Sequence, residues 1–329
     1  MGLGQGPLEG MDLNHEGASA APPGRPSTAR KSAQGVDPAA ADACPLCDHR
    51  VARPSWFGSS HFDGKDFLYV ECQHCRSLYC RPMPDAVTVA KMYGPQYGAT
   101  FQEETNQRDP KDPARVARFL RKLPGGTFVD YGCGSGAALK EAAAAGWRAV
   151  GFELDENVAR ATAESTGLEI LSDLSRLQRE HAADALHLGD VLEHLTDLNH
   201  QMPEILRILK PGGVLIAQGP LEANANLFTL ALRLSRTIRP AAESRMPPYH
   251  VMLATAAGQQ MLFSRFGLQQ LEFELEEVEW PAPSRLPLSD LRRPRAVALF
   301  SMRKVSQAIS ALRPRRWGNR YFYAGRWAG

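Results

Sequence analysis

Two pairs of cysteines are the first residues whose type and spacing suggest chemistry. Cys44 and Cys47 form one Cys-x-x-Cys pair, and Cys72 and Cys75 form a second. In a chain without a secretion signal, this spacing favours a metal over disulfides. Four thiolates fill the tetrahedral shell of Zn²⁺ and leave no position for water, so we predict one structural zinc. Reduced free thiols are the alternative. Other residues that could replace one ligand are His49, His61, His74 and Cys80.

A glycine-rich turn in segment 128–136, Phe-Val-Asp-Tyr-Gly-Cys-Gly-Ser-Gly, is the second such feature. A short strand (127–130) precedes it and an alanine-rich helix (137–145) follows. Glycines let the backbone approach a ligand closely, and a helix N-terminus offers N–H groups. Glu153 ends the next strand about 20 residues further on, where a carboxylate can accept hydrogen bonds from both ribose hydroxyls. An adenosine-containing ligand is therefore expected.

A nicotinamide dehydrogenase is the rival interpretation of this turn. Its G-x-G-x-x-G fingerprint fails here, because Ala137 stands three residues after Gly134. Cys133 lies within the turn but has no basic partner in sequence, so we predict a packing role for it.

The chain continues as alternating strands and helices, which is typical of a parallel sheet. We expect a helix from Asp155 to Ser165, strands at 185–188 and 214–218, and a helix between them. The apolar face of that helix is assigned to Ile205, Leu206, Ile208 and Leu209. Towards the end we expect a helix at 256–266, a strand at 268–280 with Leu271, Phe273 and Leu275 on one face, and a final strand at 320–324.

Two further segments complete the pattern: Val191 to His194, which reads Val-Leu-Glu-His, and Leu209 to Gly213, which reads Leu-Lys-Pro-Gly-Gly. With the glycine turn and Glu153, they make residues 114–280 resemble the class I S-adenosylmethionine (SAM) dependent methyltransferases. The resemblance implies an α/β fold with a Rossmann-like seven-stranded mixed sheet. Its last strand runs antiparallel, and segment 320–324 is expected to supply it.

The same resemblance implies the cofactor-binding residues. Gly132, Gly134 and Gly136 line the turn beneath the methionine moiety, and Asp130 holds its amino group through a water or backbone contact. Glu153 binds the ribose. Asp173 lies where family members contact the adenine amine, and Asp190 follows the fourth strand at the ligand edge of the sheet.

His250 and His194 are the candidate catalytic residues. Either imidazole could take a proton from a hydroxyl or carbon acid as that group attacks the sulfonium methyl. A backbone-bonded histidine that only shapes its loop is the alternative. Quinone O-methyltransferases use a Glu-x-x-Glu-His cluster for a divalent metal, and Asp190, Glu193 and His194 are the corresponding group here.

The predicted domains are a disordered leader (1–41), a zinc-ribbon-like module (42–82), a linker (83–113) and a methyltransferase domain (114–329). The net charge of +2 conceals an acidic body and a basic tail. Segments 226–239 and 295–313 are basic and amphipathic; they could cover the site, meet a partner or lie on an anionic membrane surface. With neither a signal peptide nor a membrane-spanning stretch in the sequence, a cytoplasmic location is expected.

The leading functional hypothesis is methyl transfer to an oxygen or carbon atom of a small-molecule acceptor, such as a sugar or a quinone-like compound. The first alternative is an RNA methyltransferase, in which the zinc module and basic tail contact phosphates. The second is a protein that binds SAM without turnover and serves in interactions.

Overall fold

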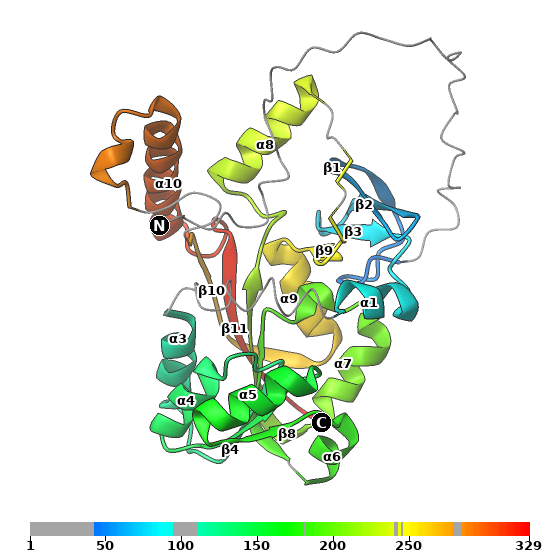
Figure 1. Cartoon of the computed structure of the whole chain (residues 1–329), viewed down its shortest axis with the longest axis vertical. Coiled ribbons are helices and arrows are strands. Elements are labelled where there is room, and N and C mark those ends of the chain that lie inside the picture. The colour runs from blue at the N-terminus through cyan, green and yellow to red at the C-terminus, as the bar shows by residue number, and fades with distance from the viewer. Residues whose placement is uncertain (1–42, 95–110, 181, 240–242, 245, 279–284) are drawn as a thin grey trace.

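The chain folds around one large and one small β-sheet (Figure 1). The computed structural model describes residues 43–94, 111–180, 182–239, 243–244, 246–278 and 285–329. The predicted leader, residues 1–41, lies outside the described residues. So does segment 95–110 of the predicted linker, whose described part contains helix α1 (Ala86–Met92).

The large sheet has seven strands and confirms the predicted mixed Rossmann-like topology. In spatial order they are β10 (Leu268–Glu276), β11 (Arg320–Trp327), β8 (Leu209–Pro220), β7 (Ala183–Gly189), β4 (Thr127–Tyr131), β5 (Arg148–Phe152) and β6 (Glu169–Leu171). β11 pairs antiparallel with both β8 and β10, whereas the pairs from β8 to β6 are all parallel. The final strand is therefore the antiparallel one, as expected.

Hydrophobic side chains cover both faces of this sheet. Successive side chains of a strand point to opposite faces, so a strand that is buried on both faces must be hydrophobic along its whole length. In β4, Phe128 packs with α3 (Lys111–Leu120) and α4 (Ala137–Ala144). Its neighbour Val129 points to the other face and joins a cluster that includes residues of three further helices. These are α6 (Leu174–Glu180), α7 (Leu198–Leu206) and α9 (Ala256–Arg265).

Local sequence signals set several helix ends. The Asp155 carboxylate accepts hydrogen bonds from the N–H groups of Asn157 and Val158 at the start of α5 (Glu156–Thr166). The same helix ends at Gly167, whose φ of 69° is left-handed. Side chains of Thr255 and Asn226 cap α9 and α8 (Leu227–Ile238) in the same way.

Two expected boundaries were wrong because strand pairing overrides the local pattern. α7 ends at Leu206, so Ile208 and Leu209 are not on its face; the Ala183 N–H donates to the Ile208 carbonyl, and Leu209 begins β8. β10 ends at Glu276, and its register shifts between Gln270 and Glu272. This bulge leaves Leu271 47% exposed while Phe273 and Leu275 are buried.

The small sheet carries the cysteines and borrows its fourth strand from the second half of the chain. It consists of β1 (Ala52–Phe62), β2 (Lys65–Cys72), β3 (Leu78–Arg81) and β9 (Met252–Leu253), in that order. The buried cysteines belong to the same hydrophobic cluster as α7 and α9. The cysteine unit and the large sheet therefore share one core.

Two more helices, α8 and α10 (Pro294–Leu312), lie at the upper end of the molecule in Figure 1. Among the described residues, none of the helices combines the length and apolar character that a membrane crossing would need.

The packing of α9 on the cysteine unit yields a first prediction. A Cβ at Gly258 would overlap Ser77 Oγ and lie 3.3 Å from Cys75 Sγ. Alanine normally favours a helix over glycine, by about 1 kcal/mol. Here we expect Gly258→Ala to lower the free energy of unfolding by roughly 1–3 kcal/mol through overpacking. Chemical denaturation measures this, with exposed Ser264→Ala as the control on the same helix; equal stability of both variants would contradict the close contact.

Candidate functional site

The glycine turn joins β4 to α4 in a conformation that only glycine adopts easily. Gly132, Gly134 and Gly136 have φ angles of 77°, 50° and 73°. A Cβ at Gly132 would stand 2.9 Å from Val191 Cγ2. The N–H groups of Gly132 and Cys133 both donate to the Phe152 carbonyl, at 2.8 and 3.0 Å, which ties the turn to the end of β5.

Glu153 follows β5 and faces the same turn. Its Oε2 accepts a hydrogen bond from the Gly134 N–H at 3.1 Å, and its Oε1 accepts one from the Asp155 N–H at 3.3 Å. Burial raises the pKa of this carboxyl. An acid beside a turn with three glycines suits a ribose, whose hydroxyls can donate to the carboxylate.

Asp130 lies beneath the turn in a buried polar row. Its Oδ1 is 2.7 Å from His187 Nδ1, and the Gln218 side-chain nitrogen is 3.1 Å from His187 Nε2. All three side chains are buried. The row crosses from β4 over β7 to β8, so it fixes Asp130 from behind while the turn lies above it.

The remaining two acids expected at the cofactor have partners in the protein. Asp173 is exposed, and its Oδ1 accepts hydrogen bonds from Ser175 and from the Arg176 N–H at the start of α6. Asp190 pairs with the Arg320 guanidinium through both oxygens, at 2.7 and 3.1 Å. Arg320 also pairs with Asp112.

Both predicted catalytic histidines meet at the carboxyl ends of β7 and β8. Their rings lie edge to face, with centroids 4.9 Å apart. His194 ends a 3₁₀ turn (Leu192–His194), and its Nδ1 donates to the Tyr249 carbonyl at 2.8 Å, with the Tyr93 hydroxyl also at 2.8 Å. His250 Nδ1 lies 3.0 Å from Glu222 Oε2.

The divalent-metal group expected from sequence is not the one that the fold assembles. Asp190 is held by Arg320, whereas ligand atoms of Glu193, His194 and His250 all lie within 4.8 Å of one another. His250 therefore takes the place in the cluster that the sequence pattern assigns to Asp190. The reason is the loop before β9, which returns to the site from far along the chain.

The charges around this cluster shift its titration. Burial opposes protonation of His250, but Glu222, Glu193 and Asp190 outweigh it and raise the pKa of His250 to about 9. Burial, reinforced by Asp190, raises the pKa of Glu193 to about 7. At neutral pH the His250–Glu222 pair is thus an ion pair, with the Nδ1–H directed at the carboxylate.

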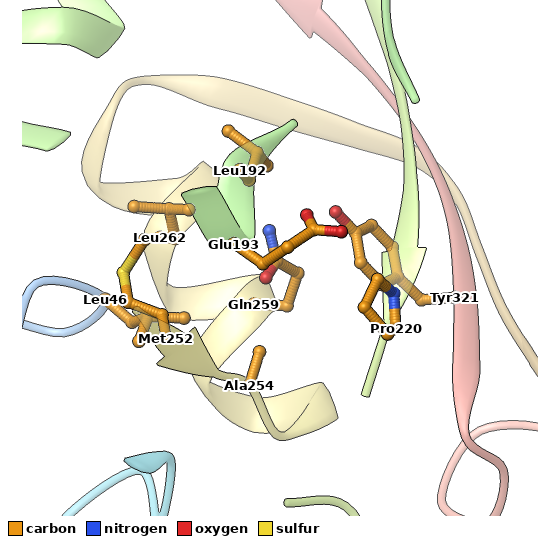
Figure 2. Close-up of a pocket in the computed structure, with 9 residues that line it drawn as sticks. All are labelled: Leu46, Leu192, Glu193, Pro220, Met252, Ala254, Gln259, Leu262 and Tyr321. Carbon is orange, nitrogen blue, oxygen red and sulfur yellow. The ribbon is translucent and has the colours of Figure 1, made fainter. Parts of the chain in front are cut away.

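A small enclosed cavity of about 10 Å³ lies beside Glu193 (Figure 2). Glu193, Gln259 and Tyr321 each present to it a buried polar atom that lacks a hydrogen-bond partner among the described residues. The Glu193 carboxylate points towards the Tyr321 hydroxyl (Figure 2). A cavity of this size holds about one water, and three polar groups can satisfy it.

The four predicted zinc ligands come together at one point. Cys44 Sγ lies 3.7 Å from Cys75 Sγ, and Cys47 Sγ lies 3.5 Å from Cys72 Sγ. A tetrahedron with metal–sulfur bonds of about 2.3 Å has edges of about 3.8 Å, so the spacing fits one four-coordinate metal. The hydrogen bond between Cys44 and Cys75 raises the pKa of the first thiol and lowers that of the second.

Both cysteine pairs have the same turn geometry. Asp48 and Arg76 each follow the second cysteine of a pair, with φ angles of 60° and 65°. Each of these residues donates its N–H to the carbonyl of the first cysteine, at 2.8 and 3.1 Å. The repeated turn brings the two sulfurs of each pair to one side.

Sequence reasoning missed several residues of the site. Glu222 stands two residues after β8. The rule that ligand-binding residues follow the carboxyl ends of parallel strands, which indicated Asp190 after β7, also indicates Glu222. Tyr93 and Tyr249 gave no signal, because they reach His194 only through the folded chain. The sequence indicated Arg320 only as the start of the last strand and not as a partner of Asp190.

The chain is similar in sequence to known methyltransferases. Residues 129–217 match the methyltransferase domain family. A ubiquinone biosynthesis O-methyltransferase from Paramagnetospirillum magneticum is 31% identical over 124 residues, covering 36% of this chain and 49% of that protein. A ribosomal protein L11 methyltransferase from Sodalis glossinidius is 31% identical over 174 residues, covering 50% and 56%.

The chain thus spans about half the length of the curated relatives it matches. Among solved structures, a SAM dependent methyltransferase from Archaeoglobus fulgidus aligns with 69% of this chain and 99% of its own, at 16% identity and a TM-score of 0.42. The family match includes the last three residues of β4, Glu153 and the Val191–His194 segment, on a sheet with the strand order described above. Residues 129–217 are therefore similar to the methyltransferase domain family, and they lie within the predicted Rossmann-like seven-stranded sheet.

Proposed function

We propose that the protein transfers a methyl group from SAM to an oxygen or carbon atom of a small-molecule acceptor. The observation that carries this proposal is the meeting of two sites at one edge of the sheet. The glycine turn and Glu153 follow β4 and β5, and the paired histidines follow β7 and precede β9. Donor and acceptor would therefore meet at the carboxyl ends of neighbouring strands, where open α/β sheets bind ligands.

The residues at the turn fit the proposed cofactor. Gly132 has no room for a side chain, and Glu153 can accept hydrogen bonds from the ribose. Asp130, held by His187, would orient the amino group through a water or the backbone. Bound SAM would supply an electrophilic methyl carbon on a cationic sulfur that can leave with the bonding electrons.

His250 is proposed as the proton acceptor and Glu222 as the residue that positions it. With Nδ1–H directed at Glu222, the ring would receive the acceptor's proton at Nε2. The carboxylate then stabilises the imidazolium that forms. A positively charged sulfonium nearby would lower the pKa of His250 and release the base when the cofactor is present.

The four cysteines are proposed to hold one structural zinc, on which the acceptor side of the site depends. Cys80 donates its N–H to the Val251 carbonyl at 2.9 Å, and the Tyr69 hydroxyl donates to the His250 carbonyl at 2.7 Å. These contacts come from β2 and β3, the strands next to the cysteine turns. A metal that orders those turns would thereby order the His250 loop.

A small molecule is the acceptor class favoured by the site itself. The two histidines lie among buried Glu193 and the half-buried Glu222, Tyr93 and Tyr249 rather than on a basic groove, which an RNA substrate would need. The name of the Paramagnetospirillum relative also indicates a small-molecule pathway, whereas that of the Sodalis relative indicates a protein substrate. Assays with both acceptor classes distinguish these possibilities.

The cofactor assignment predicts the effect of Glu153→Gln, which keeps the shape of the side chain and removes its charge. Loss of charge-assisted hydrogen bonds to the ribose should weaken SAM binding by roughly 10- to 100-fold. Isothermal titration calorimetry measures this. Exposed Glu164→Gln on α5 is the matched control and should bind SAM as the unaltered protein does; unchanged affinity in Glu153→Gln would refute the ribose contact.

The zinc assignment predicts one equivalent of zinc per chain after purification without chelators. Cys72→Ser should lose the metal and the ordered acceptor site together, so zinc content and methyl transfer fall in parallel. Cys80→Ala is the control, because this buried cysteine lies outside the four-sulfur cluster and its loss should leave zinc at one equivalent. Folded, active protein without metal would contradict the assignment.

The proton-acceptor assignment predicts a pH dependence. Because the pKa of His250 is raised to about 9 without the cofactor, the imidazole of the free protein is protonated at lower pH, so kcat/KM for SAM should rise as pH increases towards 9, whereas the inflection of kcat should lie at lower pH. Glu222→Gln removes the carboxylate that raises this pKa, and the inflection of kcat/KM should move down towards about 6.5 or below. The steady-state rate measured against pH tests both expectations.

His250→Ala should lower the turnover rate by about 10²- to 10⁴-fold while SAM affinity stays nearly constant. If the loss is confined to His194→Ala, the two histidines exchange roles. If all variants have the same pH profile, neither histidine accepts the proton, and the rate enhancement comes from positioning of the two substrates alone.

A further inference from the structure

Helices α8 and α10 form one pair at the end of the molecule shown uppermost in Figure 1. The Leu227 N–H at the start of α8 donates to Ser306 Oγ on α10 at 3.4 Å. The Arg303 guanidinium of α10 lies over the Phe228 ring of α8, 4.2 Å from its centroid. The two helices therefore present a joint outer surface.

α10 is packed with its polar side inward. Arg303, Ser306 and Ser310 are buried, and Arg303 forms a buried ion pair with Glu277. On the opposite side, Val305 is 52% exposed and Leu312 is 83% exposed. A helix on the surface of a soluble domain normally has the reverse arrangement, so the outer side of α10 is suited to an apolar environment.

α8 continues this apolar surface. Leu230, Leu234 and Ile238 are spaced by four residues and therefore lie on one stripe of the helix. Their exposed fractions rise along the helix from 44% to 67% and 78%. Just before α10, Leu288 is 85% exposed and Leu291 is 56% exposed.

Every charge in segments 227–239 and 291–316 is positive, and Asp290, between Leu288 and Leu291, pairs with Arg293. Segment 227–239 contains three arginines and no acidic residue, and segment 291–316 contains seven arginines and one lysine and again no acidic residue. The only one of these side chains that is fully buried and paired with an acid is Arg303. Outward aliphatic side chains with basic residues around them match an anionic lipid interface in both polarity and charge.

We propose that α8 and α10 bind the surface of an anionic lipid bilayer, with Leu234 and Ile238 inserted among the lipids. This inference does not rest on the proposed function, because none of the residues proposed to bind SAM or to accept the proton belongs to α8 or α10. RNA would use the arginines but not the leucine stripe, since single-stranded RNA is held by aromatic stacking and phosphate contacts.

Sedimentation of the full-length protein with vesicles tests the proposal. We expect binding to vesicles that mix phosphatidylcholine with phosphatidylglycerol and little binding to phosphatidylcholine alone. High salt should weaken the interaction. The double variant Leu234→Ser/Ile238→Ser should bind the anionic vesicles at least tenfold more weakly, and Arg239→Glu/Lys304→Glu should also bind more weakly.

Val87→Ser on α1 is the matched control, because Val87 is 64% exposed but lies on another surface. It should bind vesicles as the unaltered protein does. Thermal melting of each variant confirms that the fold persists. No binding to anionic vesicles would overturn the proposal, as would full binding by Leu234→Ser/Ile238→Ser.

Two other outcomes would assign the surface to a different occupant and refute the proposal. A dimer in solution that Leu234→Ser/Ile238→Ser dissociates would identify a second copy of the chain. Salt-sensitive binding to single-stranded RNA that Leu234→Ser/Ile238→Ser leaves unchanged, together with no vesicle binding, would identify a nucleic acid.

Discussion

Pairing between β3 and β9 is the interaction on which the rest of the structure depends. Tyr79 pairs with Met252 and Leu78 with Leu253, so a strand from the second half of the chain completes the sheet of the cysteine unit. The Val251 N–H in turn donates to the Glu193 carbonyl at 2.9 Å. One short strand thus links the four cysteines, the loop of His250 and the turn after β7. We therefore expect a change in any one of these three parts to affect the other two.

A second constraint is the burial of charge at the antiparallel strand. Arg320, at the start of β11, pairs with Asp190 after β7 and with Asp112 at the start of α3. If either acid were removed, the positive charge of the largely buried Arg320 guanidinium would be only partly neutralised, which would lower the stability of the fold. The pairs therefore hold the last strand, the strand-end turn and the helix before β4 in register, although they are distant in sequence.

In the proposed reaction, the acids and histidines of this cluster would suit transfer from a cationic donor. Glu193, whose pKa is raised to about 7, and Glu222 both face His250. Their negative charge favours a sulfonium at the edge of the sheet, while the hydrogen bond to Glu222 selects one orientation of the imidazole. Binding of the donor and control of the base would then be coupled through electrostatics.

Local residue patterns determined the sheet, the glycine turn and the four-cysteine unit. Gly132, Gly134 and Gly136 require left-handed backbone, and Cys-x-x-Cys spacing requires a tight turn, so both features act over a few residues and are legible in the sequence. Tertiary structure alone decided that Asp190 pairs with Arg320, that His250 joins Glu193 and His194, and that Leu271 is displaced by a bulge. It also turned the polar side of α10 inward, because Glu277 offers Arg303 a buried partner. These outcomes depend on contacts between segments dozens of residues or more apart, where strand pairing and charge compensation outweigh local preference.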